Sequence, residues 1–235
     1  MPQADEAGED AAQIRTVPLP ETVYRVARKH AATRYSRIRP EDDVDPKAGH
    51  RWDVVGGGVL YAGSTPRIAY VETLGVLRPA PGVVLPVADD DAQFMLPGSI
   101  PADWRDSRAI FELGAGQRDG LPVFVDLADL QTRTALGGVL REFLRPMGIG
   151  YIDVPEVTST NRVATRTLAR AIYSAQDEEG VNVYGGIRYV SRYDPQEICW
   201  AIFDHYPVEV VRQSPIEASD GVLRAAARDL GLTVH

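Results

Sequence analysis

A glycine run placed before an apolar strand limits the folds open to this chain. The segment 49–77 reads GHRWDVVGGGVLYAGSTPRIAYVETLGVL, where three glycines precede apolar residues 59–62 and a Ser-Thr-Pro helix start follows. A Rossmann dinucleotide turn needs its glycines between a strand and a helix, where the pyrophosphate meets the helix N-terminus. Here the glycines come before the strand, and the sequence has no P-loop pattern. Any nucleotide site must therefore be built from side chains.

The remaining segments mix short strands and helices without regular order. We expect strands at 23–30, 59–62, 83–87, 124–127, 187–191, 199–203 and 208–211, and helices at 66–78, 131–146, 161–176 (capped by Thr160) and 216–230. Because regular β-α-β alternation is missing, the pattern favours an α+β fold over a doubly wound sheet. The polar segment 89–108 lacks periodicity, which is more often a surface insertion than a lid over a site.

Length and composition indicate one globular domain with extensions. The chain has 235 residues, of which 44% are hydrophobic and 25% charged, as in ordinary soluble domains. Residues 1–18 are charged and rich in alanine without apolar periodicity, so we expect a disordered tail there. The folded domain is expected over 19–212, followed by a C-terminal helical extension over 213–235.

Several functional classes are disfavoured by the bulk properties. The net charge of −8 argues against a nucleic-acid-binding surface, which needs clustered Lys and Arg. The apolar runs are shorter than the roughly 18 residues that span a membrane, and the acidic N-terminus is unlike a secretory signal. The single cysteine, Cys199, has no disulfide partner and is expected to be a small buried hydrophobe. These features fit a cytoplasmic protein.

Metal-dependent and serine-hydrolase chemistry are also disfavoured. The four histidines show no metal-ligand spacing, so no metal is expected. The acidic runs at 41–43 and 89–91 lack the calcium-loop pattern and are typical of solvated loops. Ser191 lies in YVSRY rather than in the G-x-S-x-G turn of a hydrolase nucleophile.

Three residues at regular spacing could serve one chemistry together. Arg51, Tyr61 and Glu72 are ten and eleven positions apart. A guanidinium binds phosphate bidentately, a tyrosine ring offers a flat apolar face, and a carboxylate stabilises a developing cation. Taken singly, each has an ordinary explanation: an Arg packed on a neighbouring Trp, a Tyr in the core, and a solvated Glu on a helix.

Two segments carry a family resemblance. The segment 49–74 and the segment GGIRYVSRYDPQEICWAIFD (185–204) resemble the RES domain, whose name comes from an Arg, a Glu and a Ser. YRV near residue 24 and TRTLARAIYS (165–174) add weaker similarity, and the resemblance covers roughly 22–206. It implies a fold similar to ADP-ribosyltransferases and an enzyme that degrades nicotinamide adenine dinucleotide (NAD). Many members are toxins of bacterial toxin–antitoxin pairs, held inactive by a protein antitoxin that blocks the cleft.

The resemblance also implies roles for individual residues. Arg51 would hold the pyrophosphate of NAD, Tyr61 the nicotinamide side and Glu72 the ribose. Ser191 would contact the ligand, and Arg28, preferred over Arg25, would be a second phosphate contact. No metal is expected to take part.

The acceptor of the cleaved group stays open at this point. Water would give a glycohydrolase, phosphate a phosphorylase, and a protein side chain a mono-ADP-ribosyltransferase. The first two are favoured because no segment indicates a macromolecular acceptor surface. A non-catalytic NAD or nucleotide sensor is the other alternative. It is supported by His50 and Asp53, which replace the usual Gly and Asn of the family and place an acid beside Arg51.

Overall fold

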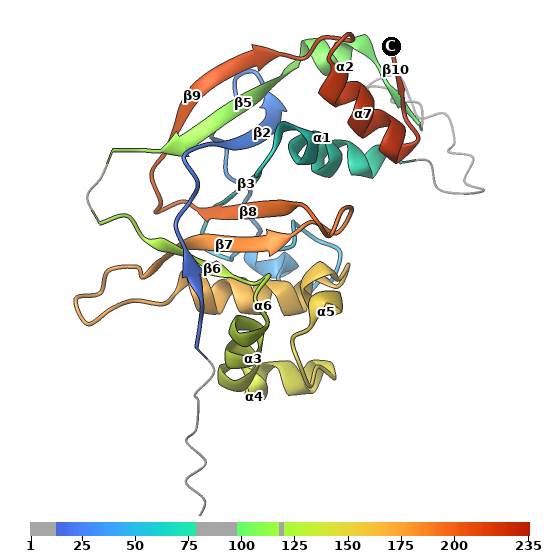
Figure 1. Cartoon of the computed structure of the whole chain (residues 1–235). Coiled ribbons are helices and arrows are strands. Elements are labelled where there is room, and N and C mark those ends of the chain that lie inside the picture. Colours follow the sequence, from blue (N-terminus) through green and yellow to red (C-terminus); the bar gives the residue numbers. More distant parts are fainter. Residues whose placement is uncertain (1–12, 79–97, 118–119) are drawn as a thin grey trace, which may run out of the picture.

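One mixed β-sheet organises the protein (Figure 1). The computed structural model describes residues 13–78, 98–117 and 120–235. The sheet has eight strands in the order β1-β6-β7-β8-β3-β2-β5-β9. Its strands are β1 (Thr16–Val17), β2 (Val23–Arg28), β3 (Val59–Gly63), β5 (Arg108–Ala115), β6 (Val123–Asp126), β7 (Tyr184–Val190), β8 (Ile198–Phe203) and β9 (Val208–Pro215).

Seven α-helices surround the described part of this sheet. They are α1 (Pro66–Leu74), α2 (Ala102–Asp106), α3 (Leu130–Val139), α4 (Arg141–Leu144), α5 (Val154–Thr158), α6 (Arg162–Tyr173) and α7 (Gly221–Leu230). A separate parallel pair joins β4 (Ser99–Ile100) to β10 (Thr233–Val234). In the eight-stranded sheet, β6 and β7 are parallel and the other neighbours antiparallel. A parallel pair needs a crossover, which α3 to α6 provide. The expected α+β class is confirmed.

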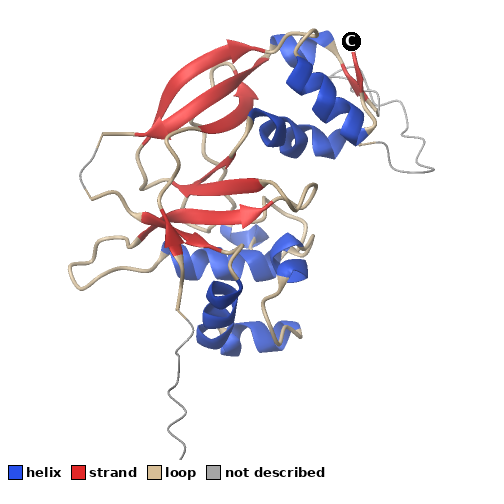
Figure 2. Ribbon diagram, in the orientation of Figure 1, coloured by secondary structure: helices blue, strands red, loops and turns tan. Residues whose placement is uncertain are grey.

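The sheet opens between β2 and β3. These neighbours share a single register pair, Tyr24 with Gly63, whereas β3 pairs with β8 over five residues and β2 with β5 over six. The strands therefore form two groups, with β9, β5 and β2 at the top of Figure 2 and β8, β7 and β6 below them, near its middle. α1 and α7 lie beside the upper group, and α6 lies beside the lower one.

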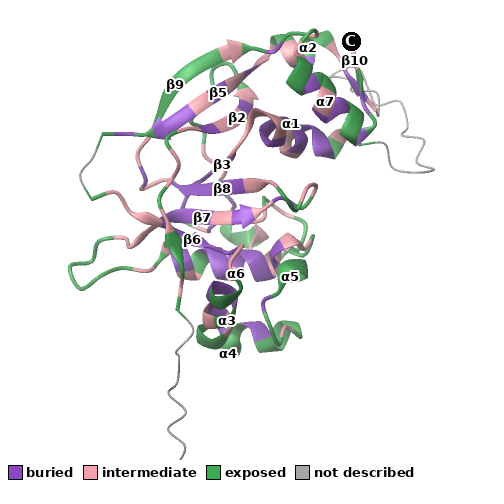
Figure 3. Cartoon of the chain, in the orientation of Figure 1, coloured by how far each residue is buried: buried purple, intermediate pink, exposed green. Residues whose placement is uncertain are grey.

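The core lies on both faces of the sheet. Along β8, Cys199, Ala201 and Phe203 pack into the larger cluster, which includes residues of α1, α6 and α7. The alternate residues Trp200 and Ile202 pack into the smaller cluster on the other face. This alternation is the period of two that a strand imposes on its side chains. Figure 3 shows the buried residues concentrated along the central strands and the helix sides that cover them.

Local signals at the start of α1 act as expected from the sequence. The Thr65 hydroxyl accepts a hydrogen bond from the backbone N–H of Ile68 at 3.2 Å, and Pro66 occupies the first turn. Both features are typical of a helix N-terminus. α1 then continues to Leu74 and ends in a 3₁₀ turn over Gly75–Leu77.

Two helix predictions need correction. α6 is capped by Asn161, whose side chain accepts from the N–H of Val163 at 3.1 Å, and not by Thr160. Amide and hydroxyl caps are almost equally suitable, so the sequence does not decide between neighbours. The single helix expected over 131–146 is two helices, α3 and α4, because Leu140 leaves helical geometry at φ −99° and ψ 10°.

The ends of the chain also differ from expectation. Residues 13–18 fell in the expected disordered tail, yet they contain β1, which pairs with β6. Ile14 packs against the larger core cluster, and this apolar contact offsets the cost of ordering the segment. The expected boundary at 212 falls inside β9, and α7 begins at Gly221 rather than at 216.

The middle of the chain holds a strand that we did not predict. β5 covers 108–115, and its residues Ala109, Phe111 and Leu113 are buried in the smaller cluster at period two. Residues 98–108 of the expected polar segment contain β4 and α2. The strand expected at 83–87 lies outside the described residues.

Gly186 in β7 provides a test of this packing. A Cβ atom there would lie 2.1 Å from the carbonyl oxygen of Ala201 and 2.6 Å from the ring of Phe124. Neither the β8 backbone nor the fully buried Phe124 can move away cheaply. We expect Gly186→Ala to lower the free energy of unfolding by about 3 kcal/mol or more, measured by urea denaturation.

Gly138 in α3 is the matched control, because an added Cβ would meet no described heavy atom within 4 Å. Gly138→Ala should raise stability by about 0.5–1 kcal/mol. Equal denaturation midpoints for the two variants would contradict the proposed close approach of β7 and β8.

Candidate active site

A cleft of about 970 Å³ lies where β2 and β3 diverge. Tyr24 and Arg25 of β2 line it, together with Tyr61 of β3, Glu72 of α1 and Tyr189 of β7. The opening in the sheet therefore brings together side chains from four elements that are far apart in the sequence. Its volume is typical of pockets for small molecules and cofactors.

The structure brings three of the predicted site residues directly into this cleft. Arg51, Tyr61 and Glu72 all belong to its lining. Ser191 is fully buried and is not among the lining residues, but its hydroxyl contacts the lining residue Glu72. The Ser191 hydroxyl is used within the protein, and its role as a ligand contact stays a prediction.

Glu72 is held by one of its two carboxylate oxygens. The Ser191 hydroxyl donates to Glu72 Oε1 at 2.5 Å, and the thiol of Cys199 lies 3.7 Å from the same atom. Oε2 has no hydrogen-bond partner among the described residues. Burial, followed by the nearby Glu72 charge, raises the pKa of Cys199 well above its usual value, so the thiol stays protonated. The carboxylate is thus fixed in orientation with one oxygen left for a ligand.

A turn after β7 fixes Ser191 against α1. The Ser191 oxygen accepts from the backbone N–H of Tyr193 at 3.1 Å. Arg67 of α1 forms ion pairs with Asp194 at 2.8 Å and Glu197 at 3.2 Å. These contacts clamp the turn to the helix that carries Glu72, so the Ser191–Glu72 distance is set by several interactions and not by one alone.

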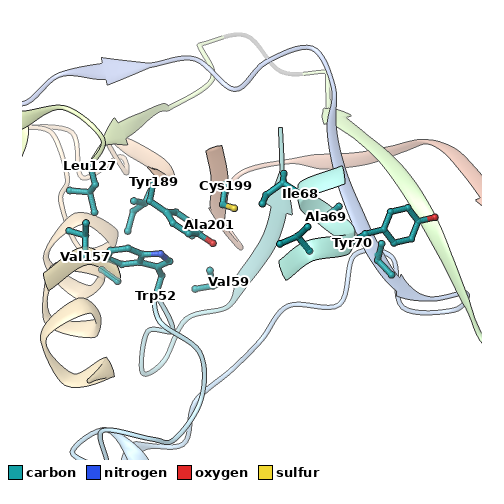
Figure 4. Packing of buried hydrophobic residues seen from close by; sticks show 14 of the residues in the cluster. Trp52, Val59, Ile68, Ala69, Tyr70, Leu127, Val157, Tyr189, Cys199 and Ala201 are labelled. Carbon is teal, nitrogen blue, oxygen red and sulfur yellow. The ribbon is translucent and has the colours of Figure 1, made fainter. Parts of the chain in front are cut away.

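Arg51 lies in a turn whose neighbour anchors it to the core. Trp52 is fully buried, and its ring centroid is 5.3 Å from that of Tyr189. Figure 4 shows the Trp52 indole between Val157 and Tyr189, with Val59 nearby. The Arg51 guanidinium carbon lies 5.5 Å from the Tyr189 ring centroid, and its Nη1 is buried without a partner among the described residues. A buried unsatisfied donor of this kind is costly unless a ligand completes it.

Tyr61 uses its hydroxyl within the protein. It donates to Asp53 Oδ1 at 2.9 Å and accepts from the backbone N–H of Trp52 at 3.0 Å. Burial and the Asp53 carboxylate raise the pKa of Tyr61 well above its usual value, so the phenol remains protonated. The ring, 5.4 Å from that of His50, is the part of Tyr61 available to the cleft.

Arginines of α6 hold the loop that leads to Arg51. The Arg166 side chain is almost fully buried and donates to the carbonyl oxygens of Ala48 at 2.7 Å and Asp45 at 2.7 Å. Arg162, one turn earlier, donates to the carbonyl oxygens of Lys47 and Gly49. Side chains four apart lie on one face of a helix, so both can reach the same loop.

The second phosphate contact expected at Arg28 is not supported by its position. Arg28 lies at the end of β2 opposite Arg108 and is not among the lining residues, whereas Arg25 is. The Arg25 guanidinium, however, donates to the carbonyl oxygens of Tyr61 at 3.1 Å and Arg34 at 3.0 Å. Burial lowers the pKa of Arg25 to about 10. Arg25 therefore supports the cleft wall.

The cleft is strongly basic although the whole chain is acidic. Glu72 is the one carboxylate among its described lining residues, against six arginines: Arg25, Arg34, Arg37, Arg51, Arg162 and Arg192. Of these, Arg37 is paired with Asp204 at 2.9 Å. Arg34 and Arg192 are exposed and form no ion pair with the described residues. The arrangement favours an anionic ligand.

Sequence reasoning missed several of these residues. Arg34 and Arg37 belong to the basic stretch RKHAATRYSRIR (28–39), whose charge density was a usable signal. Tyr189 lies within the quoted segment 185–204 but was not singled out. Asp53 is the acid that the sequence places beside Arg51. Its carboxylate accepts from Ser36, His50 and Tyr61, and no ion pair joins it to Arg51 in the described structure.

In residues 13–78, 98–117 and 120–235, no group of three or more His, Cys, Asp or Glu side chains is arranged to hold a metal ion. No helix in these ranges has the length and apolar character needed to cross a bilayer.

Comparison with protein families supports the resemblance seen in the sequence. The family model described as the RES domain matches residues 22–220, which confirms the resemblance and extends it through β9. No curated protein matches the chain.

Proposed function

The chain belongs to the RES domain family, and we propose that it binds NAD in the cleft and cleaves the nicotinamide–ribose bond. One observation carries the proposal: in a basic cleft, an arginine whose buried Nη1 has no partner among the described residues meets two tyrosine rings and a carboxylate with one oxygen free of protein hydrogen bonds. The same resemblance suggests that the sheet, open between β2 and β3, is of the ADP-ribosyltransferase type.

Binding would rest on charge and on aromatic surface. Arg51, held over Tyr189, would take the pyrophosphate, which satisfies its buried Nη1. The ring faces of Tyr61 and Tyr189 would flank the nicotinamide side of the ligand. The sequence has no glycine turn of the Rossmann type, whose backbone N–H groups would bind the pyrophosphate, so these side chains would bind the ligand instead.

Glu72 would act when the bond breaks. Cleavage between C1′ of the ribose and the nicotinamide nitrogen releases neutral nicotinamide, and positive charge develops on the ribose as in glycoside hydrolysis. The free Oε2 of Glu72 would stabilise that charge, while Ser191 holds Oε1. An acceptor oxygen then forms the new bond to C1′. When the acceptor is water, its proton leaves to solvent.

We infer that the acceptor is water or inorganic phosphate, so the enzyme is a glycohydrolase or a phosphorylase. The exposed Arg34 and Arg192 at the cleft lining could bring in a phosphate ion. A protein mono-ADP-ribosyltransferase and a non-catalytic NAD sensor are the alternatives that experiment must separate. A further proposal from family membership is that the protein is the toxin of a toxin–antitoxin pair, with an antitoxin that covers the cleft.

The first prediction concerns activity itself. Purified protein incubated with NAD and a metal chelator should release nicotinamide, detected by chromatography. Added phosphate should convert the second product from ADP-ribose to its 1″-phosphate if the enzyme is a phosphorylase. Folded protein that leaves NAD intact with either acceptor would favour the sensor.

The second prediction separates the roles of two residues. Arg51→Ala should mainly raise KM for NAD, since pyrophosphate is charged in both ground and transition states. Glu72→Gln should mainly lower kcat, by about 10²–10³, because it faces charge that develops only during cleavage. Glu178→Gln, at an exposed glutamate in a turn that does not line the cleft, is the matched control. Near-normal turnover by folded Glu72→Gln would contradict the assignment.

The third prediction concerns cells. Induced expression without a partner should arrest bacterial growth and lower intracellular NAD, because central metabolism depends on NAD. Glu72→Gln, expressed to the same level, should permit growth. Equal arrest in both strains with unchanged NAD would exclude NAD depletion as the cause. An occluding antitoxin should restore growth and bury an interface of about 1,200–2,000 Å².

A further inference from the structure

Asp53 is a buried carboxylate that the proposed chemistry leaves unused. Its side chain is fully buried, and it accepts hydrogen bonds from three donors. Ser36 Oγ and the backbone N–H of His50 reach Oδ2 at 2.8 and 2.7 Å. The Tyr61 hydroxyl reaches Oδ1 at 2.9 Å. A buried acid with this many partners has a specific structural task.

These bonds enclose Arg51. The N–H before it, on His50, is held by Asp53, and the N–H after it, on Trp52, is held by the Tyr61 hydroxyl. Asp53 therefore joins the turn that carries Arg51 to the ring of Tyr61 on β3. The turn approaches the carboxylate closely: a Cβ at Gly49, where φ is +61°, would lie 2.8 Å from Asp53 Oδ2.

Asp53 also sets the direction of the Tyr61 hydroxyl. A carboxylate can only accept, so the phenol hydrogen must point toward Asp53. The oxygen then accepts from the Trp52 N–H. Both ends of the hydroxyl are used, and only the ring of Tyr61 remains for a ligand.

The surrounding charge permits a buried acid at this position. An unpaired buried carboxylate is costly, and the buried Arg166 supplies positive charge nearby. Burial lowers the pKa of Arg166, and the carboxylates of Asp43 and Asp53 act in the opposite direction. The charge of Asp53 thus interacts favourably with that of the buried Arg166, which holds the loop that precedes Arg51.

We propose that Asp53 is a positioning residue that fixes Arg51 and the Tyr61 ring in one arrangement and turns the Tyr61 hydroxyl away from the ligand. Its ligand-binding consequence rests on the proposed function, while the coupling of Asp53 to Tyr61 does not. Two experiments address these parts separately.

The first experiment needs no ligand. Urea denaturation midpoints are compared for Asp53→Ala, Tyr61→Phe and the double variant. Both single changes remove the same hydrogen bond. The loss in free energy of unfolding should therefore be clearly smaller for the double variant than the sum of the losses for the two single variants. The control is Asp126, a buried aspartate on β6 that pairs with Arg188 of β7 at 2.6 Å. The stability losses of Asp126→Ala and Tyr61→Phe should add up in the corresponding double variant. If the stability losses of Asp53→Ala and Tyr61→Phe were additive in the double variant, the proposal would be overturned.

The second experiment measures ADP-ribose binding by calorimetry. Asp53→Ala should weaken binding at least about tenfold, as Arg51→Ala does, and the double variant should bind no more weakly than Arg51→Ala alone. Asp53→Asn should restore only part of the binding, because its carbonyl can still accept from Ser36 and His50 whereas its amide N–H₂ cannot accept from the Tyr61 hydroxyl. Asp126→Ala should bind as the wild type does.

Wild-type affinity in folded Asp53→Ala would overturn the positioning role. If the wild type binds no ADP-ribose, the proposed function fails, and the ligand-free cycle still decides whether Asp53 positions Tyr61.

Discussion

The cleft exists because β2 and β3 part after a single register pair, and Arg25 bridges the gap they leave. Parting strands expose backbone groups that would be costly if left without partners. Arg25 donates to the carbonyl oxygen of Tyr61 on β3 and to that of Arg34. A side chain thus replaces part of the missing ladder. The side chain links the two strands where they no longer pair, and the cleft lies between them.

The same use of backbone partners explains how an acidic protein builds a basic cleft. Arg25 and Arg162 both donate to carbonyl oxygens of the backbone. A carbonyl satisfies a guanidinium donor without cancelling its charge, whereas a carboxylate would cancel it. Among the described cleft arginines, Arg37 does pair with a carboxylate, that of Asp204, while the Asp194–Arg67 pair lies in the turn clamped to the helix that carries Glu72. The cleft therefore stays positively charged because Arg25 and Arg162 are hydrogen-bonded to backbone carbonyl oxygens and not to carboxylates.

The sequence predicted what depends on local signals and missed what depends on distant pairing. The capping of α1 by Thr65 and the apolar strand before it follow from adjacent residues. The bond between Ser191 and Glu72 joins residues 119 positions apart, so no spacing rule reveals it. Arg25 and Arg28 are equally basic in the sequence. Only the pairing of β2 with β3 near Tyr24 places Arg25 at the cleft and Arg28 beyond it.

Preorganisation connects these observations. Each group at the cleft has one part restrained by the protein and another left free: Glu72 by Oε1, Tyr61 by its hydroxyl, Arg51 by the turn on either side of it. Groups held this way do not reorganise when charge appears on a ligand, which is the main source of electrostatic stabilisation in enzymes. The restraints also come from separate elements, namely the turn after β7, the strand β3 and the loop held by α6. A ligand that touches all three free parts must therefore lie across the opening between β2 and β3.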